Sequence, residues 1–177
     1  MKIKKMAQIV KKEGRMRLLD VVKTESGEVQ QWIEARSCAY PLTGLPHMTA
    51  SQVMTMLELA EDDVMVSAQT YTGNRFDDLD KNDTVLEASG VRICTSESDF
   101  LLLCGLSGYV TAVQEKMLGP LGTKEIEYVD RGEAVGLMDG MMLVGIVAKV
   151  VPLVSDDAAV GVMRMGRAMM EKAQEND

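Results

Sequence analysis

The feature of this 177-residue sequence that most constrains its fold is the shortness of its apolar segments. Most of them have the length of a β-strand and end at glycine, proline, aspartate or serine, which is typical of strands joined by tight turns. Gly27 and the pair Asp139-Gly140 occur where hairpin turns need them. The pattern predicts a mostly antiparallel sheet. The expected strands are residues 15–23, 28–36, 64–70, 91–95, 100–104, 109–113, 125–129, 133–138 and 141–151.

Three segments show helical spacing instead. A short amphipathic helix is predicted over residues 1–13, with Gly14 at its C-cap, and a middle helix begins after Thr49, where Gln52 completes a capping box. A C-terminal amphipathic helix is predicted from Ser155 onward. Residues 40–46 predict an irregular crossing, and residues 71–90 a long acidic loop. With no repeat and no clear linker, we expect a single α+β domain over residues 1–177.

Composition and charge exclude several classes of protein. The net charge of −8 makes nucleic acid an unlikely partner. The apolar stretch 135–154 contains Asp139, Lys149 and Pro152, so two strands explain it better than a membrane span. No cleavable signal is visible, and we expect a cytoplasmic protein. The charge is segregated, at about +4 over residues 1–40 and about −8 over residues 41–100, which favours contacts between copies or within the chain.

Side chains for catalysis are sparse. His47 is the sole histidine, and no nucleophile elbow or phosphate-binding loop occurs in the chain. The three cysteines, Cys38, Cys94 and Cys104, form no metal-ligand spacing, and their apolar neighbours favour burial. We therefore expect no catalytic residue, no cofactor and no metal.

The acidic loop gives the one partial motif. Asp78, Asp80 and Asn82 match the first positions of a calcium-binding loop, but Asp83 and Ser89 stand where such a loop has its glycine and its bidentate glutamate. A solvated acidic loop is the simpler interpretation. The loop also supports an alternative function, a small-molecule-binding domain or an enzyme with its site at the strand ends. Such a site would bring together Tyr71, Arg75, Asp77 and Asp78 near Cys94 or Cys104.

The order of several short motifs resembles an uncharacterised family of small prophage-associated and other mobile-element proteins from gut anaerobic bacteria. The residues that carry this resemblance are Arg17-Leu18-Leu19-Asp20-Val21, Gln31-Trp32-Ile33, Ala39-Tyr40-Pro41-Leu42, Gly44-Leu45-Pro46 and Leu118-Gly119-Pro120-Leu121. That family has no assigned activity. The resemblance implies a role in assembly, packaging or host interaction rather than a reaction.

These observations together predict a non-enzymatic domain that binds protein, with a second copy of the chain as the first candidate partner. The homo-oligomer would be a phage-related structural or accessory protein. An apolar, proline-containing crossing next to a tryptophan strand is either a contact patch or part of the core. The candidate interaction residues are Trp32, Tyr40, Leu42, Leu45 and Pro46.

Overall fold

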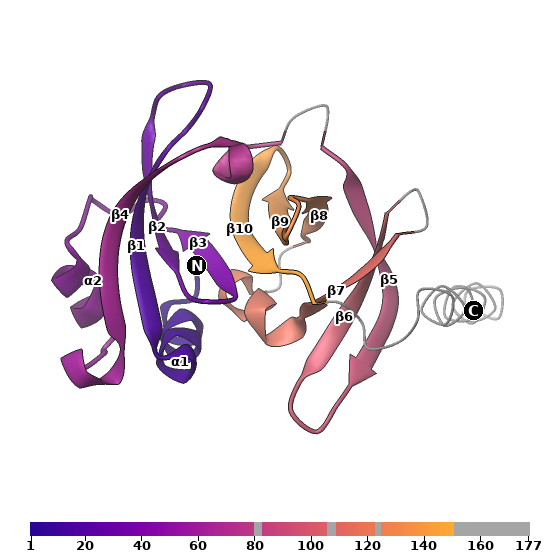
Figure 1. The fold of residues 1–177 in the computed structure, drawn as a ribbon, viewed down its shortest axis with the longest axis horizontal. Helices are drawn as coiled ribbons and strands as arrows, with labels where there is room; N and C mark the ends of the chain where they lie inside the picture. The colour runs from indigo at the N-terminus through magenta and orange to yellow at the C-terminus, as the bar shows by residue number, and fades with distance from the viewer. Residues whose placement is uncertain (80–82, 106–108, 123–124, 151–177) are drawn as a thin grey trace.

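The computed structural model describes residues 1–79, 83–105, 109–122 and 125–150 of the chain. Its strands form one sheet in the order β4-β1-β2-β3-β10-β9-β8-β5-β6-β7 (Figure 1). Every pairing is antiparallel except that of β1 with β4. The strands are β1 (Arg15–Val22), β2 (Val29–Glu34), β3 (Cys38–Pro41), β4 (Met65–Thr72), β5 (Val85–Cys94), β6 (Asp99–Gly105), β7 (Val110–Gln114), β8 (Glu127–Asp130), β9 (Ala134–Asp139) and β10 (Met142–Ala148).

Within the described residues, two α-helices and three short 3-10 helices accompany the sheet. Helix α1 (Ile3–Glu13) ends at Gly14 in the left-handed conformation, and α2 (Ala50–Met56) starts with the predicted capping box between Thr49 and Gln52. The 3-10 helices are η1 (Glu61–Asp63), η2 (Asn74–Phe76) and η3 (Glu115–Leu121). The α+β class and the mostly antiparallel sheet are confirmed. The C-terminal helix predicted from Ser155 lies outside the described residues.

The second half of the sheet closes on itself. Two residues beyond β10, Val150 exchanges two backbone hydrogen bonds with Ala112 of β7, at N···O distances of 2.8 and 3.2 Å. Because β7 stands at the far end of the sheet order, this contact joins β5 to β10 into a ring of six strands. Strands β1 to β4 extend from β10 as an open wing, seen on the left of Figure 1.

The core lies on both faces of the sheet because apolar residues alternate between the two faces along each strand. On one face, α1, α2 and η3 cover a large cluster that contains Met6, Ile33 and Leu137. On the other face, the segment around η2 covers a second cluster that contains Trp32 and Phe76. A third, smaller cluster is centred on Leu102 of β6.

Several predicted boundaries were wrong for local reasons. The crossing predicted over residues 40–46 begins as a strand, since Cys38–Pro41 pairs with both β2 and β10. The acidic loop is shorter than predicted because β5 starts at Val85. Within β5, Gly90 has a φ of 71° and the pairing with β6 shifts between Ala88 and Arg92, so a β-bulge accounts for the loop-like composition.

The helices of the described residues are all too short or too polar to cross a membrane. Most of the apolar stretch 135–154 folds as β9 and β10, as the sequence predicted.

Candidate interaction site

Three of the five predicted interaction residues are part of the core. Trp32, Tyr40 and Leu42 are all buried, whereas Leu45 and Pro46 are exposed in the loop after β3, Leu45 with 43% of its surface accessible. Of the two roles considered, contact patch or core, the three buried residues have the core role in this fold. A binding role for Leu45 and Pro46 stays a prediction.

The contacts of Trp32 and Tyr40 explain why they are buried. The Trp32 indole N–H donates to Gln30 Oε1 at 2.9 Å, and its ring meets Phe76 edge-on at 4.9 Å between centroids. The Tyr40 hydroxyl donates to the carbonyl oxygen of Met117 in η3. Both polar atoms are satisfied inside the protein, so these side chains serve packing.

Burial also makes Cys38 a poor nucleophile. Desolvation, followed by the negative charge of Glu13, raises the pKa of the Cys38 thiol to about 12. Burial likewise raises the pKa of the Tyr40 hydroxyl well above its ordinary value. Because the thiolate is the reactive form, the Cys38 sulfur is not activated at neutral pH.

The most accessible part of the sheet is β4. Seven of its eight residues are exposed, and Met65 has 75% of its surface accessible. The strand contains no charged residue and no proline, the two features with which proteins usually block an open sheet edge. Only Tyr71 is half-buried, where its ring contacts Phe76.

The backbone of β4 presents a row of hydrogen-bonding groups away from the sheet. The N–H of Met65 donates a hydrogen bond of 3.0 Å to the carbonyl oxygen of Gly14, which directly precedes the parallel neighbour β1. The direction of the backbone N–H and C=O groups alternates along a strand. Those of the odd-numbered residues of β4 therefore point toward β1, and those of the even-numbered residues point away from the sheet. No described residue bonds the outward backbone groups of Val66, Ala68, Thr70 and Thr72.

The acidic loop lines a cleft of about 790 Å³ beside the turn between β1 and β2. Arg131 holds the loop in place. Only 8% of its side-chain surface is exposed, and it forms an ion pair with Asp83 at 2.8 Å. Its guanidinium also donates hydrogen bonds to the carbonyl oxygens of Asn74, Asp77 and Asp78. This guanidinium therefore acts as an anchor for the loop.

The aspartates of this cleft are engaged as well. Asp77 Oδ1 accepts from Thr24 N–H at 2.9 Å, and Asp78 Oδ1 accepts from Leu143 N–H at 2.9 Å and pairs with Lys23 at 3.2 Å. Carboxylates held in this way fix the loop to the turn after β1 and to β10. The other calcium-pattern residues, Asp80 and Asn82, lie outside the described residues, and the described ones contain no cluster of acidic, histidine or cysteine side chains suited to a metal.

The alternative site is gathered only in part. Asp77 and Asp78 line the cleft, but Tyr71 packs on Phe76, and neither Cys94 nor Cys104 is among the residues lining this space. Cys94 is exposed, and its strongest electrostatic partner is Asp99, which raises the pKa of its thiol.

His47 lies within hydrogen-bonding distance of two side chains of the sheet. Its Nε2 lies 2.9 Å from Asp20 Oδ1 and 3.2 Å from Gln31 Nε2, and its side chain is mostly exposed. The Gln31 side chain in turn bonds Met48 through both its backbone N–H and its carbonyl. The arrangement ties the loop after β3 to β1 and β2. Among the described residues, no serine hydroxyl or cysteine thiol is hydrogen-bonded to the imidazole ring.

Comparisons with protein-family models, curated proteins and solved structures found no match. The resemblance to mobile-element proteins stays a prediction. Sequence reasoning missed the accessible edge of β4, although one signal was present: the strand predicted over residues 64–70 contains no lysine, arginine, aspartate, glutamate or proline after Val64.

Proposed function

We propose that this protein is a non-enzymatic binding domain that self-associates by strand addition at β4. The observation that supports it is the uncharged, eight-residue edge with outward backbone groups at every second position. Strand addition to such an edge gives affinity through main-chain hydrogen bonds. The resemblance to mobile-element proteins agrees with an assembly or accessory role, which belongs to the same proposal.

A second copy fits the edge better than a charged partner would. In a twofold antiparallel pair centred on Gln69, Val66 lies opposite Thr72 of the other copy and Ala68 opposite Thr70. This register engages all four outward residues of each strand, and it sets Gln69 beside its own symmetry mate. The protein carries a net charge of −8, yet this pairing brings no charged side chains of β4 together.

The central position provides a sharp test. Gln69→Lys places two positive charges side by side across the interface, and Gln69→Glu places two negative charges there. Each variant alone should therefore be monomeric by sedimentation velocity. An equimolar mixture of the two should recover the dimer. Ser51→Lys, an equal charge change at an exposed position of α2, is the matched control and should leave the dimer intact.

A backbone variant tests the edge independently of side-chain charge. Ala68→Pro removes an outward N–H and leaves the bonds to β1 in place, so the protein should fold and remain monomeric. A wild-type chain that stays monomeric at high concentration would refute self-association. A dimer that survives Ala68→Pro would refute the β4 edge as its interface.

A second candidate function follows from the cleft beside the acidic loop, where a small molecule could bind. The described residues give Glu25 and Glu28 no ion-pair partner, which favours a cationic ligand. Spermidine is a suitable probe. A concentration-dependent rise in melting temperature that disappears in the double variant Glu25→Gln/Glu28→Gln would support this function, and its absence would remove it.

A further inference from the structure

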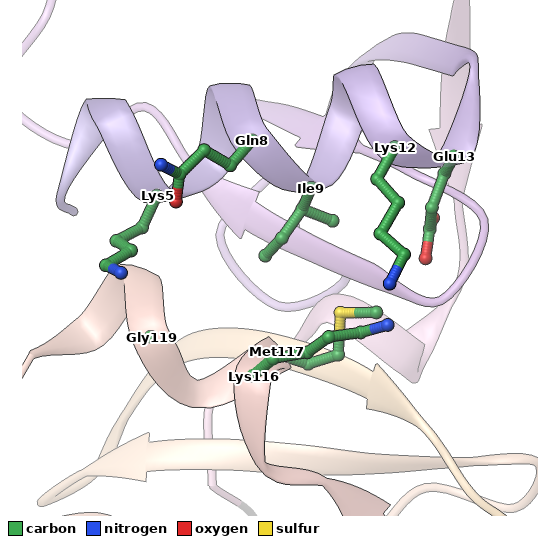
Figure 2. A pocket seen from close by; sticks show the side chains of 8 residues that line it. All are labelled: Lys5, Gln8, Ile9, Lys12, Glu13, Lys116, Met117 and Gly119. Carbon is green, nitrogen blue, oxygen red and sulfur yellow. The ribbon is translucent and has the colours of Figure 1, made fainter. Parts of the chain in front are cut away.

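A separate pocket lies where α1 packs against η3, and it shares no residue with the β4 edge or the acidic cleft. Lys2 N–H donates to Pro120 O at 2.6 Å and fixes the start of the helix on η3. The space between the two elements measures about 210 Å³ (Figure 2). It is lined by Lys5, Gln8, Ile9, Lys12, Glu13, Lys116, Met117 and Gly119.

Three of the lining side chains are lysines from two elements. Figure 2 shows Lys12 descending from α1 toward Lys116 of η3, and Lys5 reaching η3 at Gly119. Within the described part of the chain, none of these lysines forms an ion pair; the lysines that do are Lys11, Lys23 and Lys149.

The one carboxylate of the pocket is occupied elsewhere. Glu13 accepts a hydrogen bond from Ser37 Oγ at 2.6 Å and another from Ser37 N–H at 3.1 Å, one on each oxygen. Three ammonium groups therefore line a space whose single acid is hydrogen-bonded to Ser37. Figure 2 shows the amines of Lys12 and Lys116 near each other and that of Lys5 at the other end of the pocket, beside Gly119. This is a concentration of positive charge in a protein whose net charge is −8.

Two of the lysines, Lys12 and Lys116, lie close enough for their charges to repel each other. Desolvation, together with the charge and contact of Lys12, lowers the pKa of Lys116. Like charges held close to each other repel, and a bound anion would relieve that repulsion. The geometry and the charge thus favour the same kind of ligand.

The bottom of the pocket is apolar. Ile9 and Met117 are buried residues of α1 and η3, and the aliphatic stems of the lysines form much of the wall. Gly119 contributes no side chain, and a Cβ there would stand 3.8 Å from Cδ of Lys5. The pocket thus combines cations at the rim with carbon at the base.

We propose that this pocket binds a phosphate monoester whose organic part is small and apolar. The dianionic phosphate would accept charge-assisted hydrogen bonds from Lys12 and Lys116 at the rim. The apolar group would contact Ile9 and Met117. The volume suits a fragment of this size and excludes a long nucleic-acid strand.

Three probes separate the parts of this proposal in isothermal titration of the full chain at low salt. Phenyl phosphate should bind with saturation, inorganic phosphate should bind more weakly because it lacks the ring, and phenol should not bind measurably. No saturable binding of phenyl phosphate at millimolar concentration would overturn the proposal. Equal affinities for phenyl phosphate and inorganic phosphate would overturn the apolar part and with it the ligand class.

Charge-removing variants locate the site. Lys12→Met and Lys116→Met keep the aliphatic stem and should each weaken phenyl phosphate binding about tenfold, the worth of one charge-assisted hydrogen bond. Lys4→Met removes the same charge from an exposed position of α1 outside the pocket and should change the affinity by less than about twofold. Equal losses in Lys4→Met and Lys116→Met would show a diffuse attraction and overturn the site.

Unfolding curves of the free variants keep the test independent of folding. Because the repulsion between Lys12 and Lys116 is present without ligand, Lys116→Met should be at least as stable as the wild type. If Lys116→Met lost both stability and binding, Lys12→Met would take its place in the test. If both variants folded and neither weakened the binding of phenyl phosphate, the assignment of the site would be refuted.

Discussion

At Gly145 of β10, the backbone lies too close to a buried aromatic ring to leave room for a side chain. A Cβ at this position would lie 2.8 and 2.9 Å from two ring carbons of Tyr40 and 3.2 Å from Cδ1 of Leu137. The Tyr40 ring cannot retreat easily, since it is buried and its hydroxyl is bonded to Met117 O. We therefore expect Gly145→Ala to destabilise the protein.

The magnitude follows from two opposing effects. Overpacking a core costs roughly 1–3 kcal/mol, whereas replacing a strand glycine by alanine gains roughly 0.5–1 kcal/mol from the unfolded chain. The expected net loss in the free energy of unfolding is about 1–2 kcal/mol. Urea unfolding followed by fluorescence measures it directly, because Trp32 is the sole tryptophan and is buried in the folded state.

Gly105→Ala is the matched control. A Cβ at Gly105 would meet its nearest neighbour, Cδ2 of Leu86, at an ordinary contact distance of 3.5 Å. This variant should be as stable as the wild type or slightly more stable. If Gly145→Ala were no less stable than Gly105→Ala, the argument that Tyr40 and Gly145 are fitted to each other would be wrong.

Three further outcomes are expected. Arg131→Met should lower the free energy of unfolding by roughly 3 kcal/mol in urea titration, because it removes a buried charge that pairs with Asp83. In the folded protein, Ellman's reagent should modify Cys94 and leave Cys38 unreacted until denaturant is added; rapid reaction of Cys38 would contradict its burial. The folded-state pKa of Tyr40 is raised, so its stabilising effect is present below about pH 10 and is lost as the pH rises further. Tyr40→Phe should therefore reduce the fall in the free energy of unfolding at alkaline pH. An unchanged slope of this free energy against pH would refute the assignment.

Local chemistry made parts of this fold predictable. The Asp139-Gly140 turn and the Gly27 turn have positive φ at glycine as expected, and the hairpins beside them form where the sequence indicated. The capping box at Thr49 is also local and is observed with both of its hydrogen bonds. Each of these features depends on residues within a few positions of one another.

Features that depend on distant contacts were not predictable. The parallel pairing of β1 with β4 joins Arg15 to Met65, and no local pattern indicates which strand takes the edge. Trp32 and Tyr40 had an aromatic pattern compatible with either surface or core, and only the segments around Phe76 and Met117, far along the chain, bury them. The lysine pocket likewise needs α1 and η3 together.

The junction between Ala112 and Val150 gives the six-stranded ring a seam. At the other junctions of the ring, neighbouring strands share between two and six residue pairs, whereas the described residues form one pair here, held by two backbone hydrogen bonds. Because junctions with few contacts open at the lowest free energy, we expect thermal opening of the ring to begin at this one. A change that weakens the contact of Val150 with Ala112 should therefore expose the interior between β7 and β10 to solvent more often.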